Sequence, residues 1–277
     1  MTPRATSLPT LESLRDLGSR IDWSKTAGDY AQYRAGFPDP FFERLAGMEI
    51  IRAGYAALDL GCGTGAIARG LAKRAMQVTG LDRSQAMVEQ AARIDREARV
   101  TVRYVTTTAE NTGLDEKSFD LVTAGQCWHW FDSRRTAAEV RRVLRPGGKL
   151  VIASFDWIPL PGNVADETEK LIMKHNRAWK LNGGMGIHPL YAHVLGLSGF
   201  RNIETFSFDL DVPYTRESWR GRIRASAGIG ADLDQGAVER FDAEMAEMLD
   251  EKFPGDPLPV HHRVFAAFGV TGRGSLR

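Results

Sequence analysis

The sequence predicts an α/β fold built on a doubly wound, mostly parallel sheet, and three observations support it. Short apolar runs alternate with helical segments from about residue 55 to residue 154. A glycine-rich turn follows the first run, and Pro146, Gly147 and Gly148 separate the last helical segment from the fifth run. Strands that alternate with helices form βαβ units and a parallel sheet whose two faces are covered.

The first half of the chain predicts five strands joined by helices. Ser84 is a typical N-cap before a segment with apolar residues at helical spacing, and Asp132 or Ser133 can cap the later helix. In chain order we expect strands over residues 56–60, 77–82, 100–108, 118–126 and 149–154, and helices over 65–75, 84–98 and 134–145.

The pattern changes after residue 157, where a Pro/Gly break covers 156–164. We expect helices over 165–184, 191–200 and 235–253, a polar segment over 213–226, and strands over 201–212 and 261–271. The whole chain, 1–277, then forms one domain with a Rossmann-like sheet of seven strands, the C-terminal one antiparallel. Its cofactor-binding core is about 45–157, and a helical cap comes from 1–44, 158–198 and 213–260.

Composition narrows the function classes. The formal net charge is only +1, from 36 basic and 35 acidic residues, which disfavours a nucleic-acid partner. Cys62 and Cys127 are too few for a disulfide framework and match no metal-ligand spacing. No apolar run approaches the length that spans a bilayer, so we expect a cytoplasmic protein with no membrane partner.

The turn after the first strand carries the strongest functional signal. Glycines at 61, 63 and 65 let a ligand approach backbone amides and the positive end of a helix. Asp82, 21 positions after Gly61, can accept hydrogen bonds from both hydroxyls of a ribose. The spacing also fits an NAD-binding fingerprint, but Asp59 would repel a pyrophosphate and attract an ammonium group. An adenosine that carries an amino acid is therefore favoured.

Four segments, "LDLGCGTG", "GLDRSQAMVEQA", "TAENTGLDEKSFDLVTAGQCWHWFD" and "VLRPGGKL", occur in this order. Together they resemble class I S-adenosylmethionine-dependent methyltransferases of the small-molecule kind, the type 11 group that includes trans-aconitate and ubiquinone/menaquinone methyltransferases. The resemblance covers about residues 30 to 155. It implies S-adenosylmethionine as cofactor, S-adenosylhomocysteine as product, and methyl transfer by in-line displacement.

The resemblance also implies roles for individual residues. Asp82 would bind the ribose, Arg83 and Met87 would flank the adenine, and Gln126 would lie near the sulfonium. Tyr30, Tyr33 and Arg34 would cover the cofactor, with Arg34 on its carboxylate. The full cofactor-binding set is Tyr33, Arg34, Asp59, Gly61, Cys62, Gly63, Gly65, Asp82, Arg83, Met87, Thr108, Ala109, Glu110 and Gln126.

The segment "QCWHWFD" follows the fourth strand, at the sheet edge where open α/β folds bind ligands. Trp128, His129 and Trp130 are candidate walls of the reaction centre. For Trp130, as for Phe131, a role as a core and helix-entry contact is favoured over contact with the substrate. His129 is either a general base or a positioning residue. Candidate substrate residues are Trp128, His129, Trp179, His188, Trp219 and Arg222.

We therefore expect a methyltransferase that acts on an O or N atom of a small-molecule acceptor. We expect no metal, because no acidic cluster lies near the fourth and fifth strands. The protein would be a monomer or a homodimer. An NAD-dependent oxidoreductase and a non-catalytic S-adenosylmethionine-binding protein are the two alternatives.

Overall fold

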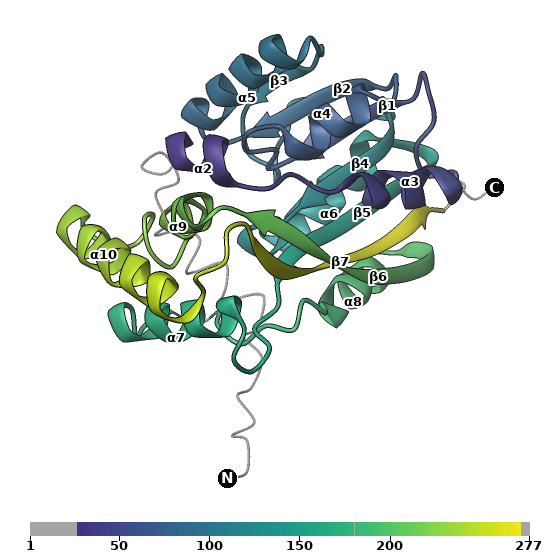
Figure 1. Ribbon diagram of the computed structural model, residues 1–277. Helices are drawn as coiled ribbons and strands as arrows, with labels where there is room; N and C mark the ends of the chain where they lie inside the picture. Colours follow the sequence, from purple (N-terminus) through teal and green to yellow (C-terminus); the bar gives the residue numbers. More distant parts are fainter. Residues whose placement is uncertain (1–26, 180, 273–277) are drawn as a thin grey trace.

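A computed structural model describes residues 27–179 and 181–272, and Figure 1 shows a central twisted sheet flanked by helices. The strands are β1 (Ala56–Leu60), β2 (Gln77–Asp82), β3 (Arg103–Thr106), β4 (Phe119–Gly125), β5 (Leu144–Trp157), β6 (Phe200–Tyr214) and β7 (Leu258–Thr271). The helices are α2 (Ala27–Tyr33), α3 (Asp39–Gly47), α4 (Ala66–Ala72), α5 (Gln85–Ala98), α6 (Ser133–Val143), α7 (Val164–His175), α8 (Pro189–Leu197), α9 (Arg216–Arg224) and α10 (Gln235–Lys252), with a 3-10 turn, η2 (Trp128–Trp130).

The seven strands stand in the order β3-β2-β1-β4-β5-β7-β6. The first five are parallel, and β7 runs antiparallel to both of its neighbours, β5 and β6. The predicted mostly parallel sheet with an antiparallel C-terminal strand is therefore confirmed. That last strand is inserted between β5 and β6, so β6 forms the edge of the sheet.

Both predicted helix caps are present. The Ser84 hydroxyl accepts a hydrogen bond from the Met87 amide at the start of α5. The Asp132 carboxylate accepts one from the Arg135 amide, at 3.1 Å, at the start of α6. A side-chain acceptor at this position satisfies one of the amides that has no partner within the helix.

Several predicted boundaries were shifted, and two differences affect the description of the fold. The helix expected over 165–184 ends at His175, and turns follow through the glycine-rich segment. The segment Pro146–Gly148 does not precede β5 but lies inside it, because Leu144 already pairs with Phe119 of β4. The register between β4 and β5 shifts after that pair, which accommodates the extra residues as an irregularity in the strand.

Each face of the sheet has its own apolar core. Leu58 and Leu60 of β1 belong to a core with residues of α6 and α8. Ala57, whose side chain points the other way, belongs to a core with residues of α3 and α4. This alternation along one strand is what a sheet buried on both faces requires.

The helices α7, α9 and α10 gather at one end of the sheet, beside α2 (Figure 1). Trp219, Phe241 and Leu249 are buried at the centre of their shared core. These helices come from the β5–β6 and β6–β7 connections, two of the regions that we expected to contribute to the cap. Within the described residues, none of the helices is long and apolar enough to span a membrane.

Candidate functional site

The turns after β1 and β4 face each other at the carboxyl edge of the sheet, because the two strands are neighbours. This is the point at which strand order reverses, where open α/β sheets bind ligands. A cavity opens there. Its walls are formed by Arg34, Gly61, Gly63, Leu81, Asp82, Arg83, Met87, Thr107, Thr108, Ala109, Glu110, Gly125, Gln126, Cys127, Trp130 and Phe131.

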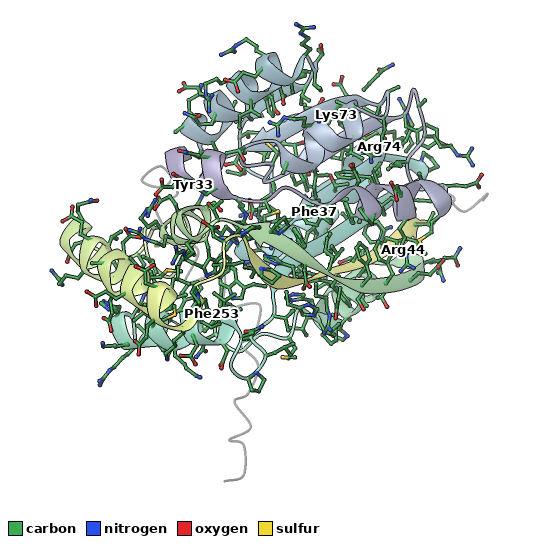
Figure 2. The ribbon with its side chains drawn as sticks, in the orientation of Figure 1. Tyr33, Phe37, Arg44, Lys73, Arg74 and Phe253 are labelled. Atoms are coloured by element: carbon green, nitrogen blue, oxygen red, sulfur yellow. The ribbon has the colours of Figure 1, made fainter. Side chains whose placement is uncertain are left out.

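A second, adjoining cavity shares four of these residues: Arg34, Gly61, Gly125 and Gln126. It extends along the glycine turn and the segment after α2, and its other walls are formed by Ala35, Phe37, Asp59, Cys62, Thr64, Ala66 and Ile67. Figure 2 shows Phe37 in the extended segment that runs from α2 towards α3. Twelve of the fourteen predicted cofactor residues line one cavity or the other; Tyr33 and Gly65 do not.

The glycine turn depends on backbone conformations that other residues avoid. Gly61 has φ +57°, and a Cβ there would lie 2.9 Å from Cβ of Cys127. Gly65 has φ +80° and caps α4, and a Cβ there would overlap the Tyr104 hydroxyl. Gly65 therefore shapes the turn from behind and does not line either cavity.

Asp82 ends β2 and faces the main cavity. Its Oδ2 accepts a hydrogen bond from the Gly63 amide and its Oδ1 from the Ser84 amide, both at 2.9 Å. Burial raises the pKa of Asp82, and these amides oppose that rise. A carboxylate has about four acceptor positions, so two amides leave room for two hydroxyl donors.

Asp59 lies deeper, 2% exposed, beneath the second cavity. Its Oδ1 accepts from the Thr123 hydroxyl at 2.7 Å and its Oδ2 from the Ala68 amide at 3.1 Å. Burial raises its pKa to about 7. Asp59 therefore links β1, β4 and α4, a structural role that its spacing before the glycines did not reveal.

A buried brace supports the turn from the other side. Asp95 of α5 is 4% exposed and accepts from Arg69 Nε at 2.6 Å and from the Tyr104 hydroxyl at 2.7 Å. Nη2 of the Arg69 guanidinium donates to the Thr64 carbonyl, within the glycine turn, at 2.8 Å. The Asp95 carboxylate thus fixes the position of Arg69, and Arg69 in turn stabilises the glycine turn.

We expect Asp95→Asn to weaken S-adenosylhomocysteine binding about tenfold, although Asp95 does not line either cavity. Removing one partner of a buried ion pair costs about 3–5 kcal/mol. The protein can relieve part of this cost by a shift of the glycine turn, and that shift would weaken binding. Calorimetric titration at a temperature where both proteins are folded measures the effect. The control is Tyr104→Phe, which keeps the contact between Arg69 and Asp95; equal losses in the two variants would contradict the brace.

Gln126, which lines both cavities, connects three parts of the chain. Its side-chain oxygen accepts from Arg34, and its Nε2 donates to the Phe155 carbonyl and to Asp156 Oδ1. Asp156 in turn lies 2.8 Å from Nε2 of His188. The predicted substrate residue His188 is thus joined to the predicted cofactor residue Gln126 through Asp156, a residue that we did not predict.

The segment after β4 divides its side chains between core and cavity. Trp128 is 0% exposed and packs in the core with Ala137 and Val140 of α6. Trp130 and Phe131, expected to be core and helix-entry contacts, line the cavity. His129 packs at an angle against Trp130, and burial lowers its pKa to about 4.

Several predicted residues lie against or within the group of helices α7, α9 and α10, which we call the cap. Trp219 is fully buried in the cap core, and Arg222 lies 4.8 Å from the ring centre of Trp157. Trp179 packs against Gly228. Tyr33 packs over Gly221 of α9, and Figure 2 shows it beside that helix.

None of these four predicted residues, Trp219, Arg222, Trp179 and Tyr33, lines either cavity. The other predicted substrate residues, Trp128, His129 and His188, do not line a cavity either. The side chain of Tyr30, the other tyrosine that we expected over the cofactor, lies outside the described residues. Among the side chains in the described part of the chain, no group of three or more His, Cys, Asp or Glu residues is arranged to hold a metal ion.

Comparison with known proteins agrees with this geometry. Residues 58–152 match the methyltransferase domain family. An uncharacterised methyltransferase of Schizosaccharomyces pombe is 30% identical over 224 residues, which cover 80% of this chain and 84% of that protein. The 27-O-demethylrifamycin SV methyltransferase of Amycolatopsis mediterranei is 37% identical over 136 residues, 47% of this chain and 49% of that protein.

A solved structure of a proposed type II methyltransferase from Anaeromyxobacter dehalogenans has a TM-score of 0.62 and 25% identity, covering 87% of this chain and 98% of that one. An uncharacterised methyltransferase of Mycobacterium bovis is 34% identical over 138 residues, and the match spans about half the length of that relative. The match to the fission-yeast protein extends over most of both chains. Fold, site and relatives agree: the chain belongs to the class I S-adenosylmethionine-dependent methyltransferases.

Proposed function

We propose that this protein transfers the methyl group of S-adenosylmethionine to an oxygen or nitrogen atom of a small-molecule acceptor. The observation that carries the proposal is the cavity at the reversal point of the sheet, where the glycine turn, Asp82 and Gln126 meet. A relative of 37% identity is named for an O-methylation of a small molecule, which agrees with the acceptor class. Family membership favours a methyl donor over a nicotinamide cofactor.

The residues present fit this cofactor by their chemistry. Met87 and Ala109 offer apolar contacts for a base next to Asp82, whose carboxylate suits ribose hydroxyls. The second cavity, lined by Arg34 and Asp59, offers opposite charges for the carboxylate and ammonium of an amino acid. When bound, S-adenosylmethionine supplies an activated methyl group, and the protein aligns the acceptor and excludes water.

Two measurements test the proposal in sequence. Calorimetric titration with S-adenosylhomocysteine should give saturable binding. Incubation with methyl-labelled S-adenosylmethionine and fractionated metabolite extract should then release S-adenosylhomocysteine and a product heavier by one methylene unit. Absence of binding would contradict the cofactor assignment, and binding without transfer to any fraction would favour the non-catalytic alternative.

The affinity for S-adenosylhomocysteine should depend on pH through Asp59. Its pKa of about 7 means that part of the population is protonated near neutrality, whereas an ammonium group nearby favours the ionised form. Binding must then release a proton below pH 7, so each unit below that value should weaken binding by up to about tenfold. We expect the dissociation constant to level off above pH 7.

The matched variant is Asp59→Asn, which keeps the shape of the side chain and removes its titration. Calorimetry between pH 5 and 7.5 should give a weaker and much flatter dependence for this variant. A dissociation constant of the unmodified protein that stays the same across this range would contradict the pairing of Asp59 with the ammonium group.

A further inference from the structure

His188 and Asp156 form a histidine–carboxylate pair beside the main cavity. The roles proposed above for the glycine turn, Asp59 and Asp82 do not involve this pair. Gln126 lines the cavity at the end of β4, and its Nε2 donates to Asp156 Oδ1 at 3.1 Å. The other oxygen of Asp156, near the end of β5, lies 2.8 Å from Nε2 of His188, in the segment just before α8. Three chain segments therefore meet beside the main cavity, which Gln126 lines and Asp156 and His188 do not.

The chemistry of this pair fixes the histidine tautomer. Burial alone would raise the pKa of Asp156, but the hydrogen bond from His188 holds it below its ordinary value. An ionised carboxylate can only accept, so Nε2 of His188 must carry the hydrogen. In the neutral ring this leaves the lone pair on Nδ1, which has no hydrogen-bond partner among the residues that the structure describes.

The ring of His188 is fixed in orientation and still accessible. It stacks on Tyr191 with ring centres 4.9 Å apart and planes 9° apart, and its edge meets Phe265 at 5.9 Å. The side chains of His188 and Asp156 are 34% and 33% exposed. The pair is therefore partly open to solvent, while the stacking limits the directions in which Nδ1 can point.

The other titratable groups around the pair come from three elements: His129 from η2, Tyr191 from α8 and His262 from β7. Burial lowers the pKa values of His129 and His262 to about 4, so both are neutral and weakly basic at pH 7. Burial raises the pKa of Tyr191, which also stays neutral. His188 is the histidine of this group that contacts a carboxylate.

We propose that His188, oriented by Asp156, accepts the proton of a hydroxyl group, and that the acceptor is a small alcohol or phenol. This inference rests on the proposed function. The acceptor oxygen forms a bond to the methyl carbon with its lone pair, and the bond between that carbon and sulfur breaks with its electron pair returning to sulfur. The hydroxyl proton moves to Nδ1 of His188, and Asp156 balances the charge of the resulting imidazolium until solvent removes the proton.

A base at this position favours acceptors with a hydroxyl group over acceptors with an amino group. A neutral amine attacks with its own lone pair and can lose its proton after transfer. A hydroxyl is a weak nucleophile until its proton is being removed, so a positioned base is worth about 10²–10⁴-fold in rate. The Asp156–His188 pair therefore fits O-methylation better than N-methylation.

The test uses matched probes, phenol with aniline and benzyl alcohol with benzylamine, together with methyl-labelled S-adenosylmethionine. We expect the unmodified protein to methylate the hydroxyl member of a pair faster than the amine. His188→Gln should lower that rate at least 100-fold and Asp156→Asn at least tenfold, while S-adenosylhomocysteine affinity stays within twofold. His193→Gln, on the exposed side of α8, is the control and should change neither.

Nitrogen NMR of histidine-labelled protein saturated with S-adenosylhomocysteine gives a readout independent of turnover. It should show His188 with hydrogen on Nε2 and a lone pair on Nδ1, an arrangement that Asp156→Asn should disturb. The inference is overturned if hydrogen resides on Nδ1, or if amines are preferred. It is also overturned if the unmodified protein and His188→Gln methylate the hydroxyl probes at the same rate, including the case in which neither protein methylates them. A third contradicting result would be that only His129→Gln removes methyl transfer.

Each of these results leaves the proposed function standing if S-adenosylhomocysteine binds. Absence of that binding would instead overturn the proposed function itself.

Discussion

Replacing Asp82 with alanine should weaken S-adenosylhomocysteine binding by about 100-fold or more. The carboxylate faces the cavity and holds the Gly63 and Ser84 amides at 2.9 Å, so its removal should take away the proposed sugar contacts and also loosen the turn. Two hydrogen bonds to a charged acceptor are worth about 1.5 kcal/mol each at the lower end, which corresponds to roughly 150-fold. Calorimetric titration measures this directly.

Asp120→Ala is the matched control. Asp120 also accepts two hydrogen bonds, from the Ala56 amide at 2.9 Å and from Arg145 at 2.5 Å, but it lies at the beginning of β4, at the opposite edge of the sheet. Its removal should lower the unfolding free energy and leave affinity within twofold. Comparable affinity losses in the two variants would mean that Asp82 acts only through general stability.

The second large effect is expected from Gly65→Ala, which should both destabilise the protein and abolish S-adenosylhomocysteine binding. Gly65 has φ +80°, a conformation that costs roughly 1–2 kcal/mol for other residues. The added Cβ would also overlap the Tyr104 hydroxyl, which donates to the buried Asp95. Overpacking adds about 1–3 kcal/mol, so denaturant unfolding should show a total loss of about 3 kcal/mol.

Gly54→Ala separates backbone strain from overlap. Gly54 has φ +82°, almost the same as Gly65, but a Cβ there would meet nothing within 4 Å. This variant should lose only about 1–2 kcal/mol and keep its affinity for S-adenosylhomocysteine. If both glycine variants lose equal stability, the contact with Tyr104 is unimportant.

The cofactor half of the site was predictable because its residues lie at the ends of successive strands. Gly61 follows β1, Asp82 ends β2 and Gln126 follows β4, so a parallel sheet must bring them to one edge. Strand order and spacing are properties of neighbouring segments of sequence. For that reason the glycine turn and Asp82 could be placed at the cavity from the sequence alone.

The acceptor end was harder to predict, and Trp128 shows why. A 3-10 turn has three residues per turn, so Trp128, His129 and Trp130 point in three directions. Trp128 enters the core and Trp130 reaches the cavity, the reverse of what we expected.

The Asp156–His188 pair was also hidden, because its members are 32 residues apart with α7 between them. Asp156 lies near the end of β5, and Gln126 lies just after β4, so the two residues occupy similar positions on neighbouring strands. This similarity is the one signal in the sequence that could have identified Asp156.

The position of β7 has a consequence for how the molecule comes apart. The connections that hold α7, α9 and α10 begin and end on β5, β6 and β7, three adjacent strands of the same sheet. Because these connections are attached to the sheet at both ends, α7, α9 and α10 cannot unfold or separate from the sheet without disrupting the pairing of β5, β6 and β7. Cap and core should therefore melt in a single cooperative transition, and tryptophan fluorescence, which senses Trp219 in one and Trp128 in the other, should trace the same curve as circular dichroism.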